Sequence, residues 1–239
     1  MKLPIQFFFK CFLLFGFIFS AQVFAKNKNN TKSVKTAKNT KAKAAHPALS
    51  LSDIVKKYRT TNFVKMKVAK IVKSELLSKE TQYKGQMFLS KGKFRWDNDV
   101  PEKTQLIFDG TTIWNVQYPP PELPGALQIA KSKVDKNTKK QILISTLLSA
   151  NGINENFKIK STKPEGPNFI FELEPKSKDL GVTSLKIKAS DKKSILEINY
   201  KDDVGNQTSL QFSDIEFLNK TQNKVFEYIP PKGAQVTHL

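Results

Sequence analysis

The dipeptide Asp109-Gly110 lies between two short runs of β-prone residues, Thr104–Phe108 and Thr111–Val116. Asp-Gly in this setting is a strong short-range signal for a β-hairpin, because a type I′ turn needs positive φ at both central residues. The pair therefore predicts a tight hairpin, and we take residues 85–114 as the nucleus of a sheet.

A second irregularity precedes this hairpin. Met87 and Leu89 share one strand parity, whereas Phe94 and Trp96 share the other, and Gly92 lies between the two pairs. A change of parity at a glycine predicts a β-bulge within one strand.

The rest of the chain alternates apolar and polar residues over many short runs separated by turn residues, as in Val64–Val68, Phe169–Leu173 and Leu185–Ala189. Such spacing predicts one antiparallel sheet that is strongly curved or closes into a barrel. Two segments have helical periodicity instead, Leu49–Arg59 and Lys139–Ala150. The expected fold is mainly β with a smaller helical part.

Residues 1–25 have the three parts of a secretory signal: Lys2 and Lys10, an apolar run over Cys11–Phe19, and a small-residue cleavage site that ends at Ala25. A retained membrane anchor is the alternative, but the apolar run is much shorter than the roughly 20 residues that cross a bilayer. Cys11 is the only cysteine, so the exported protein would contain no disulfide. We expect a signal peptide at 1–25, a disordered basic tail at 26–46 and one domain at 47–239.

The predicted tail has seven lysines and no acidic residue. It could be attracted to an anionic membrane surface or serve as a solvated spacer, and the sequence leaves both open. Residues 47–239 are also basic, with ten more Lys and Arg than Asp and Glu. The only arginines are Arg59 and Arg95, and no nucleic-acid-binding motif is present, so we expect no nucleic-acid partner.

Residues that support catalysis are scarce. The two histidines, His46 and His238, lie in the tail and next to the C-terminus, and no motif for a serine hydrolase, a metalloprotease or a phosphate-binding loop is present. Aspartates in 97–109 could bind a cation, but turn aspartates are the commoner explanation. We therefore expect that the protein is not an enzyme and that it has no metal site and no cofactor. The inner face of the sheet has two possible uses: side chains fill it completely, or it leaves a ligand cavity. Composition favours a filled core.

Five stretches resemble the LolA family of periplasmic outer-membrane lipoprotein carriers. They are G-Q-M-F-L-S-K-G-K-F-R-W at 85–96, D-G-T-T-I-W at 109–114, F-E-L-E-P-K at 171–176, G-N-Q-T-S-L-Q-F at 205–212 and F-E-Y-I-P-P-K-G at 226–233. The resemblance covers about residues 49–236. It implies an open, incomplete antiparallel β-barrel covered by short α-helices, with an apolar cavity that takes the acyl chains of a lipoprotein.

The resemblance also implies roles for individual residues. Phe94 corresponds to a family phenylalanine near the cavity mouth that bears on exchange with partners. The family commonly has Arg-Pro shortly before Phe-x-Trp, and this chain has Ser90-Lys91 there, so Lys91 is the candidate latch for the lid. The expected acyl-chain cavity consists of Met87, Leu89, Trp96, Phe108 and Trp114, although ordinary core packing is an equal alternative for Trp96. The expected lid residues are Leu51, Ile54, Val55, Ile142, Leu143, Leu147 and Leu148.

On this reading the protein is a monomeric periplasmic chaperone that carries lipoproteins from the inner to the outer membrane. Its implied partners are lipoproteins, an inner-membrane extraction complex of ABC-transporter type and an outer-membrane acceptor. Two alternatives stay open: an envelope lipid or lipoprotein sensor of the same fold, and a basic protein that binds membrane surfaces and has a filled barrel.

Overall fold

The computed structural model describes residues 49–123, 125–134 and 152–238. Several predictions lie outside these residues and remain predictions: the signal peptide, the basic tail and the helix Lys139–Ala150 with the lid residues Ile142, Leu143, Leu147 and Leu148.

The helices are α2 (Leu51–Thr60), α5 (Gly152–Asn156) and the 3-10 turns η1 (Lys178–Leu180) and η2 (Asn223–Phe226). The strands are β1 (Phe63–Ser74), β2 (Lys79–Ser90), β3 (Lys93–Val100), β4 (Thr104–Phe108), β5 (Thr112–Gln117), β6 (Gln128–Lys133), β7 (Phe157–Glu165), β8 (Asn168–Pro175), β9 (Val182–Ser190), β10 (Ile195–Asp202), β11 (Gln207–Leu218) and β12 (Val236–His238).

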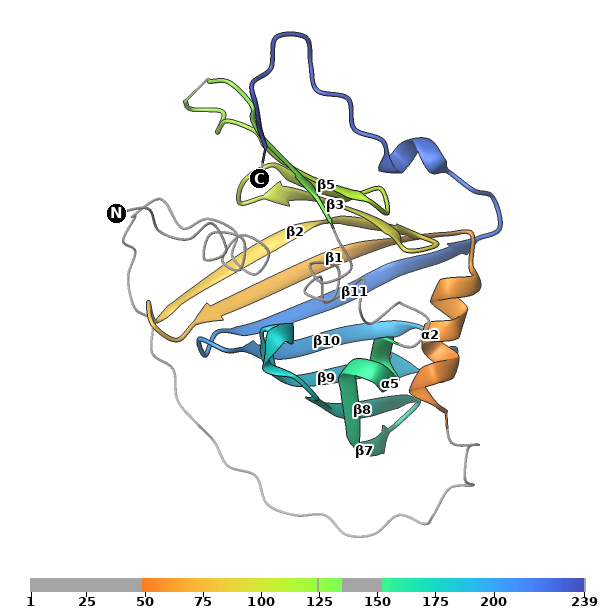
Figure 1. Cartoon of the computed structure of the whole chain (residues 1–239). Coiled ribbons are helices and arrows are strands. Elements are labelled where there is room, and N and C mark those ends of the chain that lie inside the picture. Colours follow the sequence, from red (N-terminus) through yellow and green to blue (C-terminus); the bar gives the residue numbers. More distant parts are fainter. Residues whose placement is uncertain (1–48, 124, 135–151, 239) are drawn as a thin grey trace. The chain divides into compact units, whose positions relative to one another are not determined.

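All twelve strands belong to one sheet in the order β12-β6-β5-β4-β3-β2-β1-β11-β10-β9-β8-β7 (Figure 1). Neighbouring strands are antiparallel except for β12, which pairs with β6 in parallel. Within the described residues the sheet does not close, and β12 and β7 form its two edges. The predicted fold class, an open and mainly antiparallel β-structure with short helices, is confirmed.

The helix α2 confirms the prediction for Leu49–Arg59. Ser50 caps its N-terminus, because the Ser50 side chain accepts a hydrogen bond of 3.1 Å from the backbone N–H of Asp53. The buried residues Leu51, Ile54, Val55 and Tyr58 recur at helical spacing. One apolar stripe of α2 therefore faces the sheet.

The predicted bulge at Gly92 was wrong. Lys91 and Gly92 form the turn of a hairpin, with φ of 42° and 84°, and Ser90 pairs directly with Lys93 across it. Two residues with positive φ are what a type I′ turn requires. A two-residue turn changes strand parity just as a bulge does, and here it places Leu89 opposite Phe94.

The hairpin at Asp109-Gly110 is present but is not of type I′. Only Gly110 has positive φ, 108°. The Asp109 carboxylate instead accepts hydrogen bonds of 2.8 Å from the backbone N–H groups of Thr111 and Thr112, and the loop is one residue longer than predicted. These bonds lower the pKa of Asp109 against the opposing effect of burial, which is the largest single influence on it.

Two faces of the sheet

The two faces of the sheet are covered differently. We call the face against which α2 packs the inner face and the opposite one the outer face. Tyr58 of α2 contacts the ring of Phe217 at a centroid distance of 5.1 Å, and Phe217 pairs with Val64. Side chains in register with Val64 therefore belong to the inner face.

The outer face of the β1–β6 half is covered by the chain that follows β11. Figure 1 shows this dark blue segment returning from the end of β11 to the β6 edge. Phe226 is 1% exposed and packs edge-on against Phe63, whose ring in turn stacks on Phe88. Arg95 donates a hydrogen bond of 3.2 Å to the carbonyl of Val225. The C-terminal segment thus gives this half of the sheet a second apolar layer.

Candidate functional site

The inner face has a continuous apolar row across the strands β1 to β5. Val64 pairs with Leu89, Leu89 with Phe94, Phe94 with Phe108 and Phe108 with Ile113. All five side chains are buried, and the rings of Phe94 and Phe108 lie 5.7 Å apart. The register of four hairpins therefore brings residues from five strands into one apolar band.

A second row lies one pleat along the strands. It consists of Met66, Met87, Trp96 and Leu106, which pair in that order across β1 to β4. Met66 and Met87 are buried, whereas Trp96 and Leu106 are partly exposed. The partly exposed end of this row is where the inner face is accessible.

The structure brings together four of the five residues predicted for the cavity: Met87, Leu89, Trp96 and Phe108. The placement of Trp114 with them was wrong. Trp114 pairs with Ile107 and Lys131 and lies on the outer face, where its ring is 5.3 Å from that of Tyr228. Residues of one strand alternate between faces, so Ile113 points inward instead.

The two remaining residues implied by the family resemblance differ in exposure. Phe94 is only 4% exposed and lies inside the first row, between Leu89 and Phe108. Lys91 is exposed at the turn between β2 and β3. The roles predicted for them, partner exchange and a lid latch, remain predictions.

The contact of α2 with the sheet includes a polar interaction that the sequence did not reveal. The Tyr58 hydroxyl accepts a hydrogen bond of 2.9 Å from the backbone N–H of Ile195, at the start of β10. Burial raises the pKa of Tyr58, against the smaller opposing effect of this bond. The helix is therefore tied to β10 and β11 through Tyr58, which contacts Ile195 and Phe217.

A lysine of β1, Lys70, also lies on the inner face. Lys70 has the same parity as Val64, Met66 and Val68, and it pairs with Tyr83 on one side and Leu210 on the other. Its ammonium group lies 5.0 Å from the ring centroid of Tyr83 and 5.3 Å from that of Trp96. Burial lowers the pKa of Lys70 to about 8. The sequence contains a signal for this position, because Lys70 continues the alternation of the inward residues Val64, Met66 and Val68.

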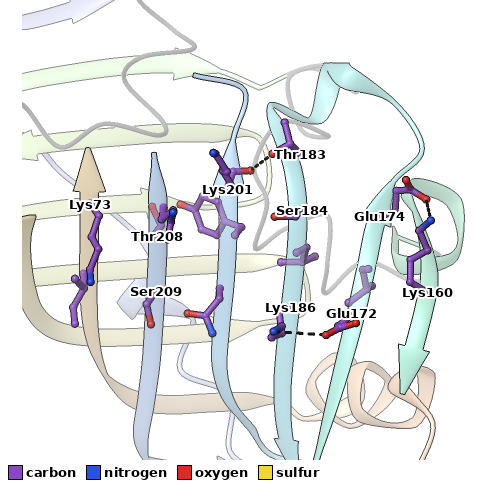
Figure 2. Close-up of a pocket in the computed structure, with 16 residues that line it drawn as sticks. Lys73, Lys160, Glu172, Glu174, Thr183, Ser184, Lys186, Lys201, Thr208 and Ser209 are labelled. Atoms are coloured by element: carbon purple, nitrogen blue, oxygen red, sulfur yellow. Dashed lines mark hydrogen bonds and ion pairs between the residues drawn. The ribbon is translucent and has the colours of Figure 1, made fainter. Parts of the chain in front are cut away.

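A groove of about 740 Å³ lies elsewhere, on the outer face over the strands β7 to β11 and β1. Figure 2 shows that lysines and glutamates line it and that Lys160 pairs with Glu174 and Lys186 with Glu172. Lys73 and Lys201 pair with Glu80 and Glu75, at 3.3 Å each. The groove is polar and its lysines are paired, so it does not resemble the apolar cavity that the sequence predicts.

Within residues 49–123, 125–134 and 152–238, no three His, Cys, Asp or Glu side chains cluster as a metal site would require. In the same part of the chain, no helix is long and apolar enough to cross a membrane.

Comparison with known proteins identifies the family. The family described as outer membrane lipoprotein carrier protein LolA matches residues 59–229. The chain belongs to the LolA family. The predicted membership of the family is thereby confirmed. The matched residues include every strand from β1 to β11.

Two sequence relatives agree with this assignment. An outer-membrane lipoprotein carrier protein of Pseudomonas paraeruginosa is 29% identical over 154 residues, which are 64% of this chain and 70% of the relative. One of Pseudomonas putida is 31% identical over 148 residues, 61% of this chain and 66% of the relative. A solved structure of an uncharacterized conserved protein from Thermus thermophilus has 14% identity and a TM-score of 0.48, covering 79% of this chain and 97% of that one. This last likeness is too distant to bear on function.

Proposed function

We propose that this LolA-family protein is a periplasmic chaperone that binds the acyl chains of lipoproteins on the inner face of its open sheet and carries them from the inner to the outer membrane. The observation that supports it most is the second inner-face row, where Met66 and Met87 continue into the partly exposed Trp96 and Leu106. The LolA relatives are named as outer-membrane lipoprotein carriers, which supports the same cargo here.

Binding of this kind needs no chemistry at the ligand. Each methylene group that moves from water to an apolar surface contributes about 0.8 kcal/mol, so several acyl chains supply ample affinity. Thioether and aromatic side chains suit flexible chains, because Met adapts its shape to irregular contacts. We therefore propose a carrier without catalytic activity, loaded by an inner-membrane extraction complex and unloaded by an outer-membrane acceptor.

A titration with a synthetic triacylated lipopeptide tests this proposal. The purified protein without residues 1–25 is compared with Leu106→Asp, which places a charge on the accessible part of the inner face. The matched control is Leu77→Asp, because Leu77 is 50% exposed in the turn between β1 and β2. Intrinsic tryptophan fluorescence and calorimetry follow binding.

We expect the unchanged protein and Leu77→Asp to bind the lipopeptide alike, and Leu106→Asp to bind it at least about tenfold more weakly, since a buried charge costs well over 1.4 kcal/mol. Equal binding of the lipopeptide and of the same peptide without acyl chains would contradict the proposal. So would equal affinities of Leu106→Asp and Leu77→Asp.

A further inference from the structure

Lys70, Trp96 and Asn98 share the inner face, beside its two apolar rows. Lys70 of β1 reaches toward Trp96 of β3, although the strand β2 separates them. Val68 pairs with Gly85, and Gly85 pairs with Asn98, so the position between Lys70, Trp96 and Asn98 is occupied by a glycine. A Cβ atom added to Gly85 would approach the carbonyl oxygen of Asp97 to 1.9 Å. The close approach of the β3 backbone therefore requires a glycine at this position, and Gly85 places no side chain between Lys70 and Trp96.

Two atoms of this cluster have unused hydrogen-bonding capacity. Among the described residues, the Nε1 atom of Trp96 and the Oδ1 atom of Asn98 are buried without a hydrogen-bond partner. The Asn98 amide nitrogen donates a bond of 3.0 Å to the Thr104 hydroxyl, which holds the amide in place. A buried polar group without a partner costs free energy, and native proteins contain few of them.

The Lys70 ammonium adds a charge to these two atoms. In the described part of the chain no carboxylate pairs with Lys70, and its interactions are those with the Tyr83 and Trp96 rings. Exposed lysines of the same strand differ: Lys67 pairs with Asp214 at 2.7 Å and Lys73 with Glu80 at 3.3 Å. An ammonium group on an apolar face is stabilised when an anion shares the site.

We propose that Lys70, Trp96 and Asn98 form a subsite that binds the anionic oxygen at the polar end of an acyl-chain ligand, a carboxylate or a phosphate. The Lys70 ammonium and the Trp96 N–H donate hydrogen bonds to this oxygen, and the Asn98 carbonyl accepts one from the ammonium or from a ligand hydroxyl. The acyl chain then lies along Met87 and Leu106. This inference rests on the acyl-binding inner face proposed above and goes beyond the lipoprotein cargo, because the acyl chains of a lipoprotein are joined through uncharged ester and amide groups. It assigns a second class of ligand, a fatty acid or an anionic phospholipid, to the same face.

Fluorescent ligands that differ only in their polar ends test the subsite. Pyrenedecanoic acid, its methyl ester and pyrenedecyl phosphate share one apolar chain, and the ester lacks a negative charge. Each is titrated at pH 7 into the protein without residues 1–25 and into Lys70→Met, Trp96→Phe and Lys84→Met. Lys84→Met is the matched control, because Lys84 is exposed on the neighbouring strand β2.

We expect the unchanged protein and Lys84→Met to bind the acid or the phosphate about tenfold more tightly than the ester, as one charge-assisted hydrogen bond would provide. Lys70→Met should bind all three ligands with the affinity of the ester, and Trp96→Phe should lose about fivefold for the charged ligands alone. A preference for the acid alone would indicate a fatty acid, and a preference for the phosphate would indicate an anionic phospholipid.

Equal affinities of the unchanged protein for acid, phosphate and ester would overturn the subsite and leave acyl binding intact. A preference for the charged ligands that survives in Lys70→Met would also overturn it. If the unchanged protein binds none of the three and does not bind the lipopeptide either, the proposed function fails together with the subsite. Circular dichroism confirms that each variant is folded before titration.

Discussion

Lys70 is the residue at which the demands of folding and of binding conflict. Its ammonium group is desolvated on an apolar face, and burial lowers its pKa from 10.5 to about 8. The nearby titratable groups are Tyr83, whose own pKa is raised by burial and then by Glu102, and Glu102 itself. A lysine that destabilises the empty protein but contacts the accessible Trp96 has a reason to be there if a ligand uses it.

The change Lys70→Met should stabilise the empty protein. The folded pKa lies below the unfolded one, so the unfolded chain binds more protons between about pH 8 and pH 10, and the free energy of unfolding of the unchanged protein rises with pH across that window. Below pH 8 the cost of burying the charged ammonium group is fully present and is about 3 kcal/mol at most. The gain in free energy of unfolding for Lys70→Met is smaller than this cost, because the variant also loses the interactions of the ammonium group with two rings.

Urea unfolding at pH 7 and pH 10 measures this effect. We expect Lys70→Met to be more stable than the unchanged protein at pH 7, and the difference to shrink toward pH 10. Lys84→Met should show no such difference, because Lys84 is exposed. A Lys70→Met variant that is less stable at pH 7 would mean that the ammonium group is well solvated.

At the scale of elements, the segment after β11 is a structural layer and not a loose tail. Phe226 in η2 is 1% exposed against Phe63, whereas Ile229, three residues later, is 84% exposed. The same segment places Tyr228 on Trp114 and ends in β12, which pairs with β6. It therefore completes the outer face of β1 to β6.

The variants Phe226→Ala and Ile229→Ala test this role of the segment. Phe226→Ala should lower the free energy of unfolding by about 3–5 kcal/mol, because it removes a fully buried aromatic ring and leaves a cavity. Ile229→Ala should change it by less than about 0.5 kcal/mol. Thermal unfolding followed by circular dichroism compares the two, and similar melting temperatures would show that the segment is not docked in solution.

The elements also show how far the sequence predicts this fold. Alternation predicted most strands and the helix α2, because those patterns are local. A turn at Lys91-Gly92 and a β-bulge both change strand parity, and only the partner strand distinguishes them. The local sequence does not predict that Trp114 lies on the outer face, because the residue that covers it, Tyr228, lies far along the chain. The local pattern does not predict the strand β6, because Gln128–Lys133 has few apolar residues and forms a strand by pairing with β5 and β12.

At the scale of the whole molecule, the positive net charge of the chain bears on whether the protein is attracted to anionic membrane surfaces. The chain has 40 Lys and Arg against 21 Asp and Glu, and seven of these lysines lie in residues 26–46. If these residues attract the protein to an anionic surface, each lysine contributes up to about 1 kcal/mol near it. The alternative of a basic surface-binding protein attributes all membrane binding to this region.

Deletion of residues 26–46 distinguishes an acyl-chain carrier from a protein that only binds membrane surfaces through its basic residues. We expect the shortened protein to lose most of its sedimentation with phosphatidylglycerol vesicles at low salt but to bind the triacylated lipopeptide as before. The loss should be mimicked by raising the salt concentration, since screening weakens such attraction. Loss of lipopeptide binding on deletion would instead assign residues 26–46 to the acyl site.

An open sheet has a further consequence at its β7 edge. In the described part of the chain, β7 has a neighbour only on its β8 side, and an edge strand of this length is a template on which other chains can polymerise. β7 bears Lys158, Lys160 and Lys163 and then Pro164, which has no N–H to offer. Positive charge and a missing donor are two obstacles to a docking strand. The sheet can therefore stay open, which leaves its inner face accessible, while the lysines and the proline of β7 oppose the fibre formation that an open edge would otherwise allow.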